Sequence, residues 1–309
     1  MGAPSGGSSG VVWFLGLLST SVGVLPECAM APLGGVLGWL WWRVFRFRRT
    51  TVRQNLALAF PDTTDRERDS LALEATRHLS RTLLEVLRLP HYARSKFERV
   101  DVCGMEHLTH ALRSGRGVLV FSGHLGSFEL AMAAGAQQAP APVSVVVKGF
   151  SAATQAFMTR VRSAAGLHVI DERFAMGPVR AALARNEIVV FVLDQNATRR
   201  RGVFVEFFGK AACTLRALAV VALRTGAPVV PVIARRDPDG RHRLTLGPPI
   251  PFESRGSMHA SVREMTQVYT SYLEGAIREA PAQWFWSHRR WKTRPISKVN
   301  TPGAGAAVF

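Results

Sequence analysis

Apolar residues between Asp62 and Leu89 recur every three or four positions, which is the spacing of one face of a helix. The stretch begins among Asp and Thr residues and ends before Pro90, and both features are typical of helix boundaries. The pattern therefore predicts one amphipathic helix over residues 62–89. Glu85 lies near its apolar side, where we expect a structural carboxylate paired with a basic group.

From Gly117 onward, short β-rich runs alternate with stretches of helical character, such as residues 152–165. The runs are GVLVFSGH, VSVVVK, LHVI, EIVVFVLD and APVVPVIARR. Strands that are separated by helices form parallel sheets, because parallel neighbours need a long crossover connection. The pattern predicts an α/β fold with a central, mostly parallel sheet flanked by helices, and a site at the carboxyl ends of the strands. The polar residues at these ends are His124, Lys148, Asp194 and Arg235.

Two apolar runs stand near the N-terminus. The run from Val11 to Leu25 is ended by Pro26 before it reaches the roughly 20 residues that span a bilayer. The run 33–42 ends in tryptophans, which prefer lipid headgroups, and arginines that favour the cytoplasmic side follow it. We expect residues 11–60 to be a helical segment that associates with a membrane surface. A buried hairpin of a soluble protein is the alternative.

The ends of the chain differ in composition from its middle. Residues 1–10 are rich in Gly and Ser, and residues 296–309 lack any periodic pattern, so both are expected to be flexible tails. The division that follows is a tail at 1–10, the membrane-associating segment at 11–60, the main domain at 61–295 and a second tail at 296–309.

The charge balance indicates an anionic partner. Lys and Arg number 39 against 22 Asp and Glu, which gives a formal net charge of +17. Nucleic acid, a phospholipid surface and an acidic carrier protein all fit this charge. The hydrophobic fraction of 47% fills a sizeable core and excludes a disordered chain. The widely spaced Cys28, Cys103 and Cys213 suggest neither a disulfide framework nor a zinc site.

His124 closes a strand, and Glu129 follows five residues later across a turn that contains Gly126. A carboxylate bonded to one ring nitrogen fixes the tautomer and leaves the other nitrogen as a base, while N–H groups at the helix start can hold an oxyanion. This arrangement suits the attack of an alcohol on a thioester. A structural histidine is the alternative for this short motif.

Other chemistries lack their motifs. The spacing of His124 and Glu129 does not place two metal ligands on one helical face, and no H-E-x-x-H is present, so no metal is expected. Neither the G-x-S-x-G of serine hydrolases nor a phosphate-binding G-x-x-x-x-G-K-[ST] loop occurs.

Two further segments concentrate charge and aromatic residues. The first runs from Asp194 to Thr214 and contains three consecutive arginines before an apolar loop, so it pairs phosphate-binding charge with apolar surface. A solvated basic loop is the alternative. The second runs from Gln283 to Pro295 and interleaves tryptophans with basic residues, which suits either base stacking or lipid headgroups.

Together these segments resemble the late acyltransferases of lipid A biosynthesis, the lauroyl and myristoyl transferase family with its H-x4-D/E motif. The resemblance covers roughly residues 10–295 in ordered blocks, which include TVRQNLALAFPD, GRGVLVFSGHLGSFELA, VRSAAGLHVI, the DQ block, TGAPVVPV and QWFWSHRRWKTRP. It implies a glycerolipid-acyltransferase-like fold on the cytoplasmic face of the bacterial inner membrane.

The resemblance implies transfer of a fatty acyl chain from an acyl carrier protein or coenzyme A thioester to a hydroxyl of an anionic lipid A precursor, with no other cofactor. His124 is then the general base and Glu129 its orienting partner. The substrate-binding residues that the motifs imply are Arg162, Asp194, Gln195 and Lys148. Two residues depart from the family pattern: Glu27, which interrupts the N-terminal apolar segment, and Arg216, which follows Thr214.

Other functions stay open at this point. The same broad family includes enzymes that acylate phosphatidylinositol mannosides and other membrane lipids. Acyl transfer to such a lipid, or to a lysophospholipid, is therefore one alternative function. A non-catalytic basic protein that binds membrane or nucleic acid explains the charge but not HLGSFE, and we expect no nucleic-acid partner.

Overall fold

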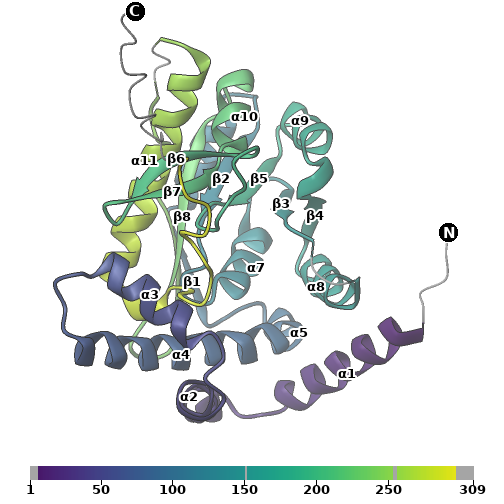
Figure 1. Ribbon diagram of the computed structural model, residues 1–309. Helices are drawn as coiled ribbons and strands as arrows, with labels where there is room; N and C mark the ends of the chain where they lie inside the picture. The colour runs from purple at the N-terminus through teal and green to yellow at the C-terminus, as the bar shows by residue number, and fades with distance from the viewer. Residues whose placement is uncertain (1–5, 150–151, 253–255, 297–309) are drawn as a thin grey trace, which may run out of the picture.

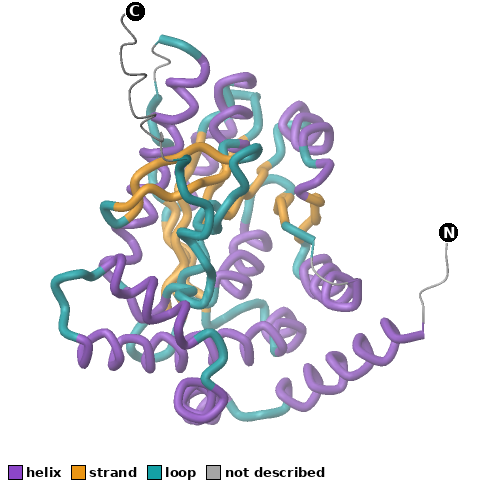
Figure 2. Tube along the Cα trace, viewed as in Figure 1, coloured by secondary structure: helices purple, strands orange, loops and turns teal. Residues whose placement is uncertain are grey.

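A computed structural model of the chain describes residues 6–149, 152–252 and 256–296 (Figures 1 and 2). The helices are α1 (Gly6–Gly23), α2 (Glu27–Leu40), the π-helical η1 (Trp41–Phe45), α3 (Arg49–Ala59), α4 (Asp65–Leu87), α5 (Leu89–Arg94), α6 (Met105–Leu112), α7 (Phe128–Gln138), α8 (Ala152–Ala164), η2 (Glu172–Phe174), α9 (Met176–Ala184), α10 (Ala217–Thr225), α11 (Met258–Glu279) and η3 (Pro281–Gln283). The strands are β1 (Val100–Cys103), β2 (Val118–Ser122), β3 (Val143–Val147), β4 (Leu167–Asp171), β5 (Ile188–Val192), β6 (Gly202–Phe207), β7 (Lys210–Leu215), β8 (Val229–Arg236) and β9 (His242–Leu246).

Seven strands form the central sheet in the order β1-β9-β8-β2-β5-β3-β4. The strands from β8 to β4 are all parallel to their neighbours, whereas β9 pairs antiparallel with β8 and β1 follows the direction of β9. The predicted α/β fold with a mostly parallel central sheet is confirmed. The two remaining strands, β6 and β7, form a separate antiparallel hairpin.

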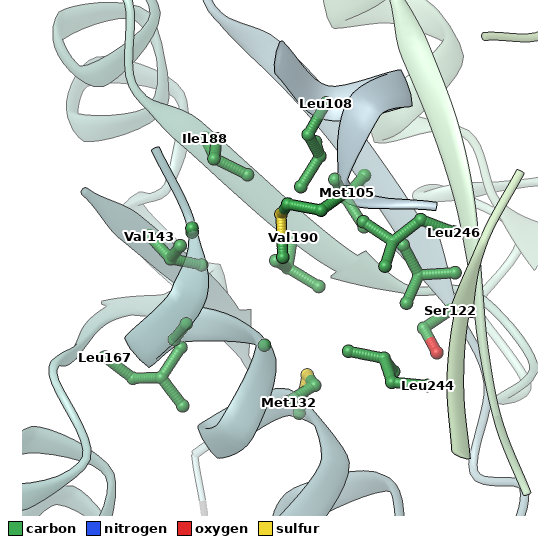
Figure 3. A pocket seen from close by; sticks show the side chains of 15 residues that line it. Met105, Leu108, Ser122, Met132, Val143, Leu167, Ile188, Val190, Leu244 and Leu246 are labelled. Carbon is green, nitrogen blue, oxygen red and sulfur yellow. The ribbon is translucent and has the colours of Figure 1, made fainter. Parts of the chain in front are cut away.

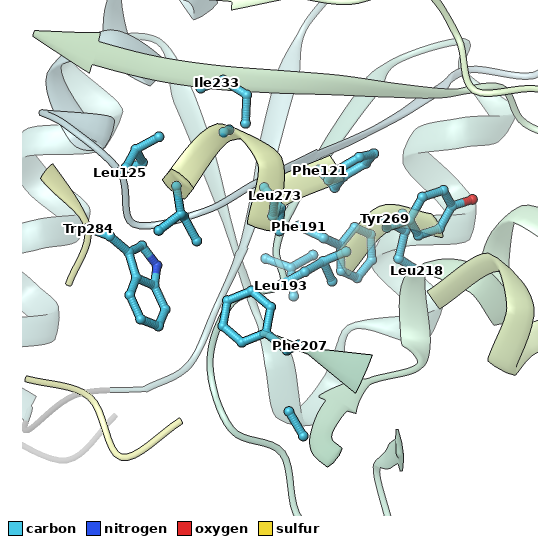
Figure 4. Packing of buried hydrophobic residues seen from close by; sticks show 14 of the residues in the cluster. Phe121, Leu125, Phe191, Leu193, Phe207, Leu218, Ile233, Tyr269, Leu273 and Trp284 are labelled. Carbon is cyan, nitrogen blue, oxygen red and sulfur yellow. The ribbon is translucent and has the colours of Figure 1, made fainter. Parts of the chain in front are cut away.

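Helices cover both faces of the sheet, so its central strands are buried on both sides. Along β2, Leu119 and Phe121 point into a cluster that includes residues of α9, α10 and α11, whereas Val118 and Val120 point into a second cluster with α6, α7 and α8. Figure 4 shows the first cluster, where Phe121 packs near Tyr269 of α11. This alternation explains why the strands appear in the sequence as continuous apolar runs.

Helix α4 confirms the amphipathic helix that the periodicity predicts. It begins with a capping box, in which Thr64 and Glu67 satisfy each other's backbone N–H groups. Glu85 is fully buried and forms ion pairs with Arg81 and Arg236 of β8. Burial opposes its charge, but the guanidinium of Arg236 holds the pKa of this carboxyl well below its usual value. The structural role that we expected for Glu85 is therefore confirmed.

The N-terminal helices lie against α4 (Figure 1). Glycines on α2 permit this close approach, since a Cβ at Gly38 would lie 2.4 Å from the Cα of Arg77. Helix α1 begins at Gly6, inside the stretch expected to be a tail, and the rest of the two predicted tails lies outside the described residues except for Ile296. Among the described residues, no helix combines the length and apolar character that crossing a membrane requires.

Candidate active site

The turn after β2 presents His124 at the carboxyl edge of the sheet. Strand β2 ends at Ser122, and α7 begins at Phe128. Gly126 has a φ of +59°, and a Cβ at this position would lie 2.9 Å from the carbonyl oxygen of Ala234. Glycine is needed here because the chain must turn in a left-handed conformation directly against β8. The backbone around His124 is therefore held between the end of β2 and the tight turn at Gly126.

Asp194 is the hydrogen-bond partner of the His124 side chain. The imidazole Nδ1 lies 2.7 Å from Oδ1 of Asp194, and the backbone N–H of His124 donates to Oδ2 at 2.6 Å. A third donor, Nε1 of Trp284, reaches Oδ2 at 2.7 Å. The Asp194 side chain is only 2% exposed, so these three donors replace the water that the carboxylate loses.

The register of the sheet produces this pair. Strands β2 and β5 are parallel neighbours in which Ser122 lies opposite Val192. Two residues further along each chain, the same register brings His124 opposite Asp194. The site thus lies at the carboxyl ends of adjacent parallel strands, as the fold class predicts.

Glu129 does not make the hydrogen bond that the sequence analysis assigned to it. Its buried carboxylate binds Arg162 of α8, with Nε at 3.0 Å from Oε2 and a second, short bond from Nη2 to Oε1. The first turn of α7 directs Glu129 toward α8, where a buried carboxylate finds a fork-shaped guanidinium. The partner of the imidazole is therefore Asp194, which we had placed among the substrate-binding residues. Whether Glu129 takes part in catalysis stays a prediction.

The opposite ring nitrogen faces Gln195. Its side-chain Nε2 lies 3.1 Å from Nε2 of His124. With a proton on Nδ1 directed at Asp194, Nε2 carries the lone pair and accepts from the Gln195 amide. Two aromatic rings flank the imidazole, with Phe128 edge-on at 4.6 Å between centroids and Phe285 at 5.9 Å. An incoming hydroxyl that displaces the amide would meet a basic nitrogen with apolar walls.

Electrostatics raise the pKa of the His124 imidazole. Burial alone lowers the pKa of His124, but the adjacent carboxylate of Asp194 outweighs it and, with a smaller contribution from Glu129, raises the pKa above its usual value. The same pairing lowers the pKa of Asp194 against the effect of its burial. The pair therefore combines an ionised carboxylate with a histidine that holds a proton more tightly than usual.

The segment 283–293, here called the C-terminal strap, closes over the site. Gly126 N donates to the carbonyl of Gln283 at 3.0 Å, and Phe285 N donates to the carbonyl of His124 at 3.2 Å. Further along, Nε2 of His288 accepts from the backbone N of Asn196 at 2.9 Å, and the fully buried Arg290 donates to the carbonyl of Cys213. The strap thus fixes the histidine turn and the loop after Asp194 together.

The interpretation of this segment as a lipid or base contact is wrong for its tryptophans. Trp284, Trp286 and Trp291 are 2%, 1% and 8% exposed and belong to the hydrophobic core. Their indole rings pack against Phe207 and Phe208 of the β6–β7 hairpin. Figure 4 shows Trp284 beside Phe207. Aromatic and basic residues alternate here because the strap directs its tryptophans and Arg290 into the core, whereas Arg289 and Lys292 are exposed.

Two further residues that the sequence placed at strand ends, Lys148 and Arg235, differ in their surroundings. Lys148 is exposed after β3, and its charge adds to burial, the main cause, in lowering the pKa of His288 to about 4. It therefore lies at the same edge as the histidine. Arg235 binds Glu279 at 2.7 Å and the carbonyl of Ala276 on α11. Its side chain is thus engaged in packing this helix onto β8.

An apolar cavity of about 40 Å³ lies on the other side of the turn, between the sheet and helices α6 and α7. Figure 3 shows Met105, Leu108 and Met132 pointing into it, with the Ser122 hydroxyl at one side. Gly135 of α7 also lines it, and a Cβ there would lie 2.5 Å from Leu244. Flexible methionine side chains in the wall allow such a cavity to change its shape.

A family model for bacterial lipid A biosynthesis acyltransferases matches residues 7–293. The chain belongs to this family. The acyltransferase is 28% identical to a lipid A biosynthesis lauroyltransferase of Escherichia coli (strain K12), over 93% of this chain and 90% of the relative. It is 29% identical to a lipid A biosynthesis palmitoleoyltransferase of the same organism, over 93% of each chain.

A relative with another acceptor in its name is also similar. The acyltransferase is 25% identical to a phosphatidylinositol mannoside acyltransferase of Mycolicibacterium smegmatis (strain ATCC 700084 / mc(2)155), over 78% of each chain. The resemblance stated from the sequence blocks is therefore confirmed, and acyl transfer is the shared activity of these relatives.

Trp284 and Phe128 are members of the site that were not predicted from the sequence. Trp284 lies within the strap segment, yet nothing local in the sequence connects it with Asp194, 90 residues away. Phe128 stands inside HLGSFE itself. Its position between the histidine and the acidic residue of the motif was the available signal.

We predict that Trp284→Phe raises the pKa of His124 in the acyltransferase further, because Oδ2 of Asp194 loses a donor and the carboxylate becomes a stronger proton acceptor. Titration of the imidazole Cε1 proton by NMR, assigned with His124→Ala, measures this pKa. Trp286→Phe is the matched control, since its Nε1 donates to the carbonyl of Pro281 at 2.7 Å instead. An unmoved or lowered pKa in folded Trp284→Phe contradicts the assigned hydrogen bond.

Proposed function

We propose that the acyltransferase moves a fatty acyl chain from an acyl carrier protein or coenzyme A thioester to a hydroxyl of a lipid A precursor. The pair of His124 and Asp194 carries this proposal. Nδ1 of the imidazole lies 2.7 Å from Oδ1 of Asp194, and Nε2 faces Gln195 between the flanking aromatic rings. Family membership supplies the reaction class.

In the proposed reaction, Nε2 of His124 takes the proton of the acceptor hydroxyl as its oxygen attacks the thioester carbon. The resulting imidazolium is stabilised by the ionised carboxylate of Asp194 through Nδ1–H. When the tetrahedral intermediate collapses, the C–S bond breaks and the proton passes from His124 to the leaving thiolate. The ester and the free thiol are the products, and the protein forms no covalent intermediate.

Arg162 supports the stabilisation of the oxyanion. Two of its guanidinium nitrogens bind Glu129, whereas the buried Nη1 has no hydrogen-bond partner among the described residues. A buried unpartnered N–H is costly unless a ligand satisfies it. The charges of both Arg162 and Glu129 act on the pKa of His124, so the pair belongs to the electrostatic environment of the imidazole. We assign Nη1 to the developing oxyanion, and Glu129 to holding Arg162 in place.

The apolar cavity under α7 is the proposed end of the path for the acyl chain. Its lining is almost entirely aliphatic, and Ser122, two residues before His124, borders it. A hydrocarbon chain that extends from a thioester at His124 into this space would be shielded from water, which is the principal driving force for its binding. Met105 and Met132 would move to make room, since the cavity is smaller than a fatty acyl chain.

The relatives support lipid A over other acceptors. The two Escherichia coli relatives named for lipid A match over 90% or more of their length, whereas the relative named for phosphatidylinositol mannoside matches over 78%. The mannoside or a lysophospholipid is the alternative acceptor, and it would use the same base.

We further propose that the N-terminal helices attach the enzyme to the cytoplasmic face of the inner membrane. Large apolar side chains are exposed on α1, with Trp13 at 70% and Phe14 at 58%. Two more are exposed at the end of η1 and just after it, with Phe45 at 74% and Phe47 at 58%. Exposed arginines surround the second group, namely Arg43, Arg46 and Arg48. Aromatic residues beside arginines fit an anionic membrane surface.

We expect His124→Ala to lower acyl transfer at least about a hundredfold while the fold is retained, because a positioned base contributes this much to the rate. The assay follows labelled acyl groups from carrier protein and from coenzyme A to a lipid A precursor, with circular dichroism as the check on folding. Near-normal turnover by His124→Ala would refute the mechanism.

Mass spectrometry of lipids from a deletion strain tests the acceptor. We expect lipid A to lose one secondary chain, whereas altered phospholipid chains would favour the alternative acceptor.

Replacing both Phe45 and Phe47 by Ser is expected to weaken binding to phosphatidylglycerol vesicles at least about tenfold. Each aromatic side chain that enters the membrane contributes more than about 1 kcal/mol to binding. Co-sedimentation measures the bound fraction. Phe174→Ser is the control, since this residue is 73% exposed but belongs to η2, away from the N-terminal helices. Equal binding of the double variant and the wild type would exclude this attachment site.

A further inference from the structure

A basic pocket of about 390 Å³ lies at the carboxyl edge of the sheet, apart from the histidine pair. Its lining residues are Arg173, Thr198, Arg200 and Arg201. Arg173 lies just after β4, and the other three residues lie in the loop between Asp194 and β6. Strands β2, β5, β3 and β4 are parallel neighbours, so this pocket shares an edge with His124. Three strand spacings of about 4.8 Å separate them, or roughly 15 Å along the edge.

Two of the guanidinium groups are held in place by carboxylates at the end of β4. Arg173 binds Asp171 at 2.6 Å, and Arg201 binds Glu172 at 2.8 Å and donates to its carbonyl at 3.1 Å. Arginine side chains lose considerable rotamer freedom on binding a ligand, and such anchoring reduces that loss.

The backbone of the arginine loop is fixed as well. Arg201 N and Gly202 N both donate to the carbonyl of Thr198, at 3.0 and 2.9 Å. The side chain of Arg216 donates to the carbonyl of Arg200 at 3.3 Å, and its backbone N donates to the carbonyl of Arg201. Arg216, which departs from the family pattern, thus supports the loop that carries the three arginines.

Charge in the pocket is unbalanced. Three guanidinium groups, those of Arg173, Arg200 and Arg201, are accompanied by only two carboxylates, those of Asp171 and Glu172. The side chain of Arg200 makes no ion pair or hydrogen bond with any residue in the described part of the chain. The Thr198 hydroxyl adds a further donor. A set of three arginine forks, two of them anchored, with excess positive charge and a hydroxyl matches the oxygen atoms of a phosphate group.

We propose that this pocket binds a phosphate group of one substrate and so fixes that substrate roughly 15 Å from the reacting atoms. The inference rests on the proposed function, and it adds a subsite to it. The phosphate belongs either to the lipid acceptor or to the pantetheine arm of the thioester donor. Lys148, exposed at the end of the intervening strand β3, continues the positive charge between the pocket and His124.

Steady-state kinetics of Arg200→Gln test the subsite and identify the source of the phosphate. We expect KM for one substrate to rise about tenfold, with kcat changed less than twofold, because the subsite binds ground state and transition state alike. A higher KM for the acceptor assigns the pocket to the acceptor phosphate, and a higher KM for the donor assigns it to the pantetheine arm. Arg113→Gln is the matched control, since this exposed arginine precedes β2 at the opposite edge.

Titration with inorganic phosphate keeps the subsite testable if no acyl transfer is detected. Calorimetry on the wild type, Arg200→Gln and Arg113→Gln measures phosphate affinity without turnover. We expect binding to the wild type and to Arg113→Gln, and at least fivefold weaker binding to Arg200→Gln. The inference is overturned if Arg200→Gln binds phosphate as tightly as the wild type does, or if both KM values stay within twofold. Phosphate binding by an inactive wild type would instead refute the proposed function alone.

Discussion

The structure depends on the buried carboxylate of Asp194. A carboxylate that leaves water must have its charge compensated, and here three N–H donors converge on it from His124 and Trp284. One donor belongs to the turn after β2, another to the imidazole and the third to the C-terminal strap. The single group thus joins two strand ends to the last described segment of the chain. It also determines which nitrogen of the imidazole carries the proton.

Two other buried carboxylates surround the same turn, and each has its own guanidinium. Glu129 on α7 binds Arg162, and Glu85 on α4 binds Arg236, whose backbone exchanges hydrogen bonds with the side chain of Gln283 in the strap. Removal of one partner of such a buried pair typically costs about 3–5 kcal/mol, because the other charge is left uncompensated. The histidine therefore stands in a rigid frame, which is what a general base needs in order to act at a fixed distance.

Local patterns sufficed for the elements but not for the contacts between them. The periodicity of residues 62–89 and the apolar runs predicted α4 and the central strands, because each pattern reflects burial on one face or on two. His124 could be placed at a strand end for the same reason. Its partner could not, since Glu129 is near in sequence whereas Asp194 becomes its neighbour only because β2 and β5 are adjacent in the sheet. Strand order is a property of the whole fold and has no local signal.

The tryptophans of the strap illustrate a second limit. Tryptophan beside arginine is found both at membrane surfaces and in cores where the cation is hydrogen-bonded, and composition does not distinguish the two. In the structure the buried Arg290 donates to backbone carbonyls and to Thr214, and the neighbouring Trp291 packs in the core. The exposed Phe45 and Phe47, at the end of η1 and just after it, also stand beside arginines, but their side chains face solvent.

Acyl transfer by Asp194→Asn tests the central claim most directly. An amide in place of the carboxylate keeps the shape of the site but neither fixes the Nδ1–H tautomer nor stabilises the imidazolium. We expect kcat to fall at least about a hundredfold, with an unchanged circular dichroism spectrum. A folded Asp194→Asn protein with near-normal kcat would contradict it.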